Sequence, residues 1–120
     1  GDRAVQRSDG TTYGGERIRA AFPRGTTPTL KFTLPFEAKQ LTSVYITFAQ
    51  SYREVLTKHG DEITAEGNQL IVELSQDDTL LFRPQPVDIQ IRAIDAAGNA
   101  IASKIITADV SKILRDGVIE

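Results

Sequence analysis

The single histidine of the chain, His59, is the residue type best suited to acid–base or nucleophilic catalysis. A catalytic triad needs such a base within hydrogen-bond reach of a serine, and no serine stands in a nucleophile motif such as G-x-S-x-G. His59 precedes Gly60 in a turn-like stretch, and a turn holds catalytic groups in poor geometry. We therefore interpret His59 as a solvated turn residue and predict a protein that is not an enzyme and has no catalytic residues.

Two acidic pairs, Asp61-Glu62 and Asp77-Asp78, carry side chains that could hold a metal ion. Neither pair has the D-x-[DN]-x-[DN]-G spacing that gathers oxygens around calcium, and Asp77-Asp78 is better explained as the acidic start of a helical turn. Paired carboxylates also hydrolyse glycosides, but a domain of 120 residues has little room for the required cleft. Cysteine is absent, which excludes thiolate metal sites and disulfides. We predict no metal and no cofactor, with adventitious calcium in a loop as the alternative.

Exposed aromatic residues are the usual platform for sugar binding, and the chain has no tryptophan and three tyrosines. Tyr45 is expected on the outward face of a strand, beside Tyr52. This pair is a candidate for weak glycan binding. Cross-strand packing or a subunit interface is the interpretation that we favour.

Composition places the chain among globular domains. A chain of 120 residues that is 40% hydrophobic and 25% charged fits one domain with one core. Its net charge of −2 gives no concentrated positive face for nucleic acid. No run approaches the roughly 20 apolar residues of a membrane span, so neither a nucleic acid nor a membrane is an expected partner.

The two ends of the chain differ from its middle. Residues 1–24 are rich in glycine and arginine, and we predict a flexible basic arm there, followed by one domain over residues 25–120. The arm is either a mobile tail or expression remnant, or a segment that orders on a neighbouring subunit through the apolar cluster around Ile18 and Phe22. Residues 111–120 keep apolar side chains, so they either pack under the domain or await a partner.

Alternation of apolar and polar residues predicts the strands that position these side chains. Leu70, Val72 and Leu74, for example, point to one face of a strand. Turn-prone residues separate the segments, and the stretch from Asp95 to Asn99 predicts a hairpin. The expected strands cover residues 30–34, 44–48, 52–57, 62–65, 69–74, 87–94 and 100–110.

One connection between these strands is different in kind. The stretch from Ser75 to Asp78 has the form of a capping box and predicts a single helical turn. Pro84 and Pro86 forbid a longer helix, so the segment crosses from one sheet to another, with Leu80 or Phe82 plugging the open end. We therefore predict an all-β fold, an immunoglobulin-like antiparallel β-sandwich of about seven strands with one short helical turn in a crossover.

The succession RGTTPTLKFTLPF, SVYITFAQ, QLIVELSQDDTLLF and VDIQIRAIDAAGNAIASKIITADVSKILRDGVI resembles a family of small tail or virion-associated proteins of phages and prophages from Gram-positive gut bacteria. Its layout is also similar to the immunoglobulin-like N-terminal domain of phage baseplate upper proteins. The resemblance covers residues 24–119 and leaves the arm outside the pattern. Its most specific parts are the RGTTPT entry, the LSQDDTLLF crossover and the DGVI ending.

The resemblance implies a non-catalytic structural protein of a virion, made in the bacterial host cytoplasm, whose partners are other virion proteins and copies of itself. Head, tail and baseplate positions all stay open. The alternative is a carbohydrate- or receptor-binding adhesion module, because such sandwiches serve many functions. The residues expected to make assembly contacts are Arg17, Ile18, Arg19, Phe22, Tyr45, Tyr52, Val118 and Ile119.

Overall fold

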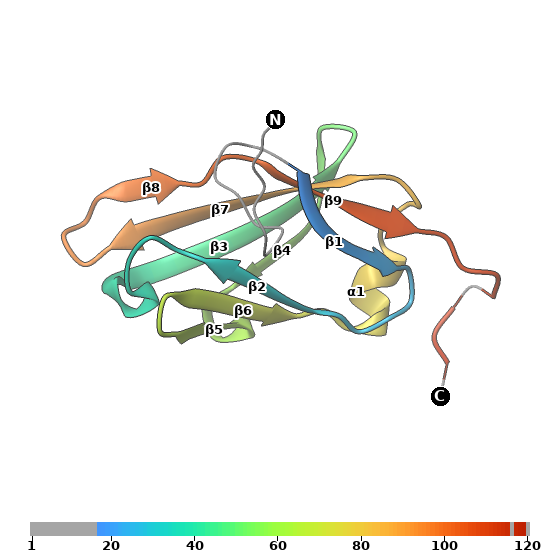
Figure 1. Cartoon of the computed structure of the whole chain (residues 1–120), viewed down its shortest axis with the longest axis horizontal. Coiled ribbons are helices and arrows are strands. Elements are labelled where there is room, and N and C mark those ends of the chain that lie inside the picture. The colour runs from blue at the N-terminus through green and yellow to red at the C-terminus, as the bar shows by residue number, and fades with distance from the viewer. Residues whose placement is uncertain (1–16, 116, 120) are drawn as a thin grey trace.

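The computed structural model describes residues 17–115 and 117–119, which form two packed β-sheets (Figure 1). The larger sheet has the order β1-β9-β7-β3-β4, with β8 also paired to β7, and the smaller sheet has the order β2-β6-β5. The strands are β1 Arg17–Pro23, β2 Thr29–Thr33, β3 Leu41–Gln50, β4 Arg53–His59, β5 Ile63–Glu66, β6 Gln69–Glu73, β7 Val87–Asp95, β8 Ala100–Ala102 and β9 Ile106–Ser111. The helices are the 3-10 turns η1 Ala38–Gln40 and η2 Gly60–Glu62, and the α-helix α1 Gln76–Leu80.

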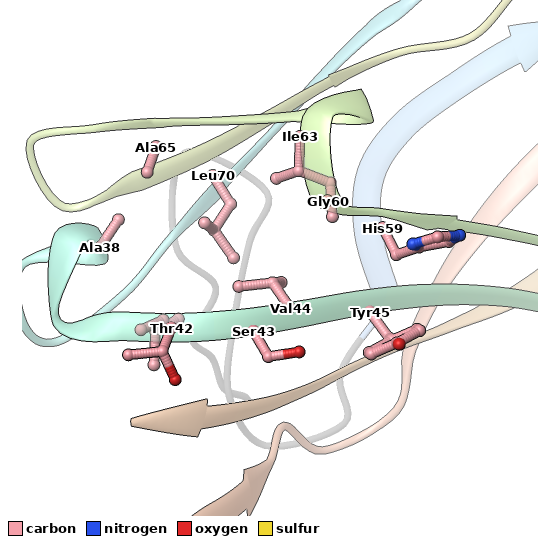
Figure 2. A pocket seen from close by; sticks show the side chains of 11 residues that line it. Ala38, Thr42, Ser43, Val44, Tyr45, His59, Gly60, Ile63, Ala65 and Leu70 are labelled. Carbon is pink, nitrogen blue, oxygen red and sulfur yellow. The ribbon is translucent and has the colours of Figure 1, made fainter. Parts of the chain in front are cut away.

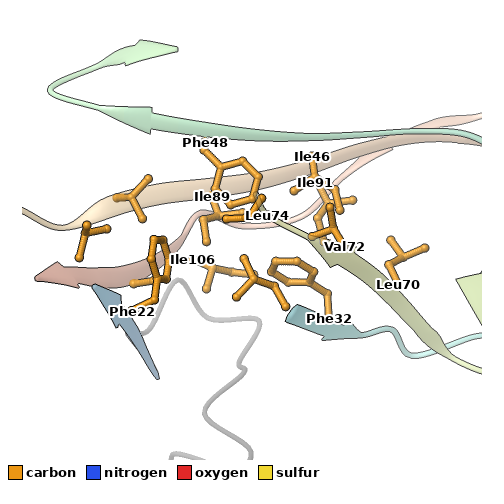
Figure 3. Close-up of a cluster of buried hydrophobic side chains, with 14 of the residues drawn as sticks. Phe22, Phe32, Ile46, Phe48, Leu70, Val72, Leu74, Ile89, Ile91 and Ile106 are labelled. Carbon is orange, nitrogen blue, oxygen red and sulfur yellow. The ribbon is translucent and has the colours of Figure 1, made fainter. Parts of the chain in front are cut away.

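The core lies between the inner faces of the two sheets (Figure 3). Each strand supplies alternate residues to it, because successive side chains of a strand point to opposite faces. Leu70 and Val72 of β6 are fully buried, as are Ile46 and Phe48 of β3. The alternation in the sequence therefore identified the buried faces correctly.

The crossover after β6 also follows the prediction. Ser75 caps α1, because its Oγ accepts a hydrogen bond from the Asp78 backbone N–H at 3.0 Å while its own N–H donates to Asp78 Oδ2 at 2.9 Å. Phe82 then fills the space between the sheets and packs against the rings of Phe22 and Phe48, with centroids 5.9 and 5.8 Å away. The chain crosses in this way from the small sheet to the large one.

This topology defines an immunoglobulin-like β-sandwich, with β2, β6 and β5 facing a sheet centred on β7 and β3. The described residues form nine strands where about seven were predicted. One addition is β1, which pairs with β9 in parallel, so the sandwich is not wholly antiparallel. No helix in the described part of the chain has the length and apolar character of a membrane span.

The second addition comes from a break in the last predicted strand. Ala93 pairs with Ile101, but Ile89 pairs with Ile106, so the last strand carries one residue more than its partner between these pairs. Ser103 lies in the bulge. Its Oγ accepts a hydrogen bond from the Ile91 N–H at 2.9 Å and so takes the place of a backbone carbonyl acceptor. The strand is thereby split into β8 and β9.

The predicted domain boundary after residue 24 needs correction. Strand β1 lies within the predicted arm, and the side chain of Phe22 is only 3% exposed. Arg24 donates from Nε to the Phe82 carbonyl at 2.7 Å and from Nη2 to the Leu80 carbonyl at 2.9 Å, and so holds the end of α1. The sandwich therefore includes residues 17–24, while the rest of the predicted arm lies outside the described residues.

Candidate functional site

Tyr45 is a predicted contact residue that lies beside both an aromatic partner and a surface hollow. It lies on β3 opposite His59 of β4, is 48% exposed, and stacks on the His59 ring with a centroid distance of 5.2 Å and an interplanar angle of 19°. His59 is therefore not a free turn residue, since it ends β4 and its N–H donates to Glu62 Oε1 at 3.0 Å where η2 begins. The stacked pair forms a fixed aromatic feature at the edge of the large sheet.

A hollow of about 330 Å³ opens beside this stacked pair, where the chain leaves β4 and crosses through η2 to the small sheet (Figure 2). Leu70 belongs to its buried floor, and Val44 and Ile63 face each other from the two sheets. Its lining residues are Ala38, Leu41, Thr42, Ser43, Val44, Tyr45, His59, Gly60, Ile63, Ala65 and Leu70. The lining mixes apolar and polar side chains and includes no aspartate, glutamate, lysine or arginine, so it offers no charged partner to a charged substrate.

A second hollow, of about 390 Å³, also has Tyr45 in its wall. It is lined in addition by β4 and by the β7–β8 hairpin, including Ile94 and Ile101. Polar pairs stand in the same wall: Thr57 Oγ1 lies 3.3 Å from Thr47 Oγ1 and also donates to the Glu54 carboxylate. These polar groups satisfy one another, so the wall offers a contact surface.

Tyr52 lies at the tip of the β3–β4 hairpin and is fully exposed. Ser51 and Tyr52 have φ angles of 51° and 64°, the left-handed conformation that a two-residue hairpin turn of this kind requires. Tyr45 pairs with His59, whereas the tip follows the Gln50–Arg53 pair, so about five strand residues, or ~17 Å, separate the two tyrosines. The expectation that Tyr45 lies beside Tyr52 is therefore wrong, and the two rings do not form one platform.

The predicted contacts in β1 divide into two groups. Phe22 is buried in the core against Phe82, so it holds β1 in place and is not an exposed contact. Strand β1 contains Arg17, Ile18 and Arg19, and Arg17 is in register with Thr107 of β9. The side chains of these three residues lie outside the described part of the structure.

The C-terminal contacts predicted at Val118 and Ile119 are exposed at 50% and 62%. The side-chain amide of Gln76 on α1 holds this segment at both backbone groups of Ile119: the Ile119 N–H donates to Gln76 Oε1 at 2.9 Å, and Gln76 Nε2 donates to the Ile119 carbonyl at 3.1 Å. Leu81 and Leu114 are also exposed, at 56% and 103%. We call Leu81, Leu114, Val118 and Ile119 the C-terminal apolar group.

The acidic groups of the described residues offer no metal site. No cluster of three or more histidine, aspartate or glutamate side chains suited to a metal occurs among these residues. Lys58 Nζ lies 2.9 Å from Asp78 Oδ2 and ties β4 to the start of α1. Burial raises the pKa of Asp78, but hydrogen bonds from Ser75 and the charge of Lys58 outweigh that effect, so its pKa is below the usual 3.8. Asp78 is therefore a charged helix cap.

Three exposed isoleucines near the free end of the large sheet were not among the predicted contacts. Ile94, Ile101 and Ile105 are 44%, 38% and 49% exposed. The sequence held a signal for Ile94, because it shares the outward face of β7 with Asp88, Gln90 and Arg92 and breaks their polar pattern. We call these isoleucines and Tyr45 the sheet apolar group. Tyr45 and Ile94 lie on the outward face of the sheet, whereas Ile101 is opposite the buried Ala93 and so lies on the other face.

Comparison with known proteins gives similarities of architecture. The sequence matches no protein-family model and no curated protein. The protein CopC from Methylosinus trichosporium OB3b aligns with 80% of this chain and 90% of its own, at 12% identity and a TM-score of 0.49. The immunoglobulin-like domain of mouse leukocyte-associated immunoglobulin-like receptor 1, solved as a strand-swapped dimer, aligns over 89% and 98% at 9% identity and a TM-score of 0.43.

The V domain of amphioxus IgVJ-C2 aligns with 77% of this chain and 99% of its own, at 11% identity and a TM-score of 0.32. Such values transfer no function, because unrelated proteins share this architecture. The class of the protein, an immunoglobulin-like β-sandwich domain, therefore rests on its own sheet order.

Proposed function

We propose that this protein is a non-catalytic structural or assembly component of a bacteriophage or prophage particle, and that it acts through protein–protein contacts in the tail, the baseplate or a capsid-associated layer. Its partners are other virion proteins and further copies of the chain. Its place of action is the virion, after synthesis in the bacterial host cytoplasm.

The observation that carries this proposal is the distribution of exposed large apolar side chains. Most of them belong to the sheet apolar group or to the C-terminal apolar group, which come from different parts of the chain. Single exposed apolar residues are ordinary on monomers, whereas grouped ones are typical of interaction surfaces. A protein with two such regions is suited to contact more than one neighbour, as a component of a repeating assembly must.

The sequence resemblance to virion-associated proteins supports the phage assignment. The crossover LSQDDTLLF, which resembles that of virion-associated proteins, forms the capped helix α1 and the core plug Phe82. The motif therefore has a structural role in the fold of the chain, as a helix cap and a core side chain. This agrees with a component selected for assembly.

The decisive experiment is mass spectrometry of purified particles induced from a bacterium that encodes this chain. We expect the chain to copurify with the major structural proteins at a constant ratio through a density gradient, and a cytoplasmic host enzyme to be lost. If the chain stays with the soluble host proteins while particles sediment intact, the proposal is wrong.

The adhesion alternative has weaker support, because Tyr45 and Tyr52 lie at opposite ends of the β3–β4 pair. A glycan array on the purified chain tests it, with Tyr45→Ala as the matched variant. Saturable binding of one glycan class that is lost in Tyr45→Ala would favour adhesion over assembly. We expect no specific binding.

A further inference from the structure

The turn between β3 and β4 is the place in the described residues where amino acids other than glycine have a left-handed backbone (Figure 1). Ser51 has a φ of 51° and Tyr52 a φ of 64°. A two-residue turn of this kind prefers asparagine and glycine, because a Cβ comes close to the backbone in this conformation. The other left-handed positions of the described chain are all glycines, namely Gly25, Gly60, Gly67, Gly98 and Gly117. The fold itself therefore favours glycine at position 52 over tyrosine.

Tyr52 contributes no packing that would offset this strain. Its side chain is 102% exposed, so the ring projects from the molecule. The backbone beneath the ring is held in place, because the Gln50 amide bonds to the backbone of Arg83 and Gln85, and Gln85 Nε2 donates to Ser51 Oγ at 3.2 Å. Strained residues that the surrounding structure holds in this way cluster at binding sites. The turn thus presents a preorganised aromatic ring to a partner.

Two arginines flank this turn. Arg53 pairs with Gln50 at the start of β4, and the backbone of Arg83 bonds to the Gln50 side chain, so both residues lie at the base of the same hairpin. Both arginines are exposed. The ion pairs found among the described residues belong to Lys58 and not to these arginines. Within the described chain, neither guanidinium group is neutralised by a carboxylate.

The carboxylates of the neighbouring strand positions are engaged elsewhere. Glu54 accepts a hydrogen bond from Thr57, further along β4 and away from the turn. Asp88 accepts a hydrogen bond from Thr107 Oγ1 of β9 at 3.1 Å, on the side of β7 that faces away from β4. The tip of the hairpin therefore presents positive charge to a partner.

We propose that Ser51, Tyr52, Arg53 and Arg83, which we call the tip surface, bind an acidic segment of a partner protein. Tyr52 packs on the apolar side chains of that segment, and the two guanidinium groups pair with its carboxylates. Tyrosine and arginine are the residue types that contribute most to protein interfaces when they are rigidly held. Two arginines are too few to follow a nucleic-acid backbone, which favours a protein partner.

This inference deepens the proposed function and rests on it, because it names the chemistry of one virion partner. The two can fail separately. A contact between the tip surface and an acidic segment of a host protein outside the particles would overturn the virion assignment alone. A chain that is found in particles but contacts no acidic segment through Tyr52 would overturn the tip surface alone.

The first measurement is the melting temperature of purified Tyr52→Gly. We expect it to rise by roughly 2–6 °C, because glycine relieves the left-handed strain and the lost side chain packs on nothing. Thr64→Gly is the control, since it places glycine at an exposed strand position, and it should lower the melting temperature. An unchanged or lower melting temperature for Tyr52→Gly would show that the tyrosine serves the fold and would contradict the proposal.

The second measurement identifies the partner by photo-cross-linking. The photoreactive aromatic residue p-benzoylphenylalanine replaces Tyr52 in cells that produce the particles, and mass spectrometry locates the cross-linked peptide. We expect one major partner protein, linked within a segment that has more aspartate and glutamate than lysine and arginine. The same photoreactive residue at Thr64 is the control and should not give this product. Cross-links to a neutral or basic segment, to nucleic acid, or equally from both positions would overturn the proposal.

The third measurement tests the charges with a fluorescein-labelled peptide of ten glutamates, followed by fluorescence anisotropy at low ionic strength. We expect saturable binding, with a Kd that rises roughly tenfold in the double variant Arg53→Gln and Arg83→Gln. Lys31→Gln with Lys39→Gln removes the same charge from exposed positions elsewhere and should change the Kd less than about twofold. Equal losses in the two double variants, no binding up to millimolar peptide, or tighter binding of a ten-residue thymidine oligonucleotide would contradict the proposal.

Discussion

At the scale of single residues, Gln50 shows how one buried amide joins distant segments. It is 6% exposed at the end of β3. Its Nε2 donates to the carbonyls of Arg83 and Gln85, both at 3.0 Å, and its Oε1 accepts from the Arg83 N–H at 2.8 Å. A primary amide matches this set because it both donates and accepts. Gln50 thereby fixes the base of the Tyr52 hairpin to the crossover.

We predict that Gln50→Ala lowers the free energy of unfolding by about 2 kcal/mol, because three backbone groups lose their partner in a place with little water. Urea unfolding monitored by circular dichroism measures this loss. Gln85→Ala, which removes an exposed bond from Nε2 to Ser51 Oγ at 3.2 Å, should cost less than about 0.5 kcal/mol. Equal losses in the two variants would show that the buried amide has no special role.

Asp78 gives a prediction on pH. Its folded pKa lies below the usual 3.8 despite burial, because Ser75 and Lys58 stabilise the carboxylate. A lowered folded pKa contributes stability that is fully present above the unfolded pKa and is lost as pH falls through the folded pKa. We therefore expect Asp78→Asn to flatten the decline in unfolding free energy as the pH falls below about 4.

The comparison must concern the slope with pH, since Asp78→Asn also weakens the helix cap. The pKa of Asp95 is lowered as well, chiefly by the Asn99 backbone hydrogen bond, and this contribution is the same in both proteins. Parallel curves for the natural chain and Asp78→Asn in chemical unfolding across this pH range would contradict the assignment.

At the scale of elements, the junction of β1, α1 and the C-terminal segment depends on Gly25. Its φ angle is +75°, and a Cβ there would lie 3.1 Å from Ile113 Cδ1 and 3.5 Å from Leu80 Cδ2. The RGTTPT entry therefore requires glycine both for its backbone conformation and for the close approach of two apolar side chains.

We predict that Gly25→Ala destabilises the fold by roughly 1–3 kcal/mol, from the left-handed conformation together with the crowding. Gly98→Ala is the matched control, because Gly98 has a φ of +88° but a Cβ added to it would meet no atom within 4 Å. Thermal unfolding should show the larger loss for Gly25→Ala. A larger loss for Gly98→Ala would mean that crowding at Gly25 relaxes without cost.

At the scale of the whole molecule, stability and contact formation use different residues. The core residues lie between the sheets, whereas the C-terminal apolar group is exposed and its last residue is held through backbone bonds to Gln76. Changes in that group should therefore affect association and leave folding nearly unchanged.

We predict that the double change Leu114→Ser and Val118→Ser alters the free energy of unfolding by less than about 0.5 kcal/mol and reduces incorporation into particles. Phe82→Ala, in the core, should cost about 3–5 kcal/mol and lower incorporation through loss of folded protein. Unfolding curves and quantitative mass spectrometry of particles separate the two effects. Full incorporation of the folded double variant would exclude the C-terminal apolar group from assembly.

The elements that depend on local rules could be predicted from the sequence. The period of two in residues such as Leu70 and Val72 identified buried faces, and the capping box at Ser75 identified α1, because both signals arise from neighbouring residues. The same signals predicted the crossover between sheets. They also placed Tyr45 on an exposed face.

The pairing of distant segments, by contrast, is visible only in the folded molecule. Strand β1 forms because Phe22 packs against Phe82 in the core and because β1 pairs with the edge of β9. Neither contact can be predicted from the residues close to position 22. The split of the last strand follows from the position of Ser103 against Ile91. The separation of Tyr45 from Tyr52 follows from strand register. These are non-local properties, since each depends on which strand lies next to which.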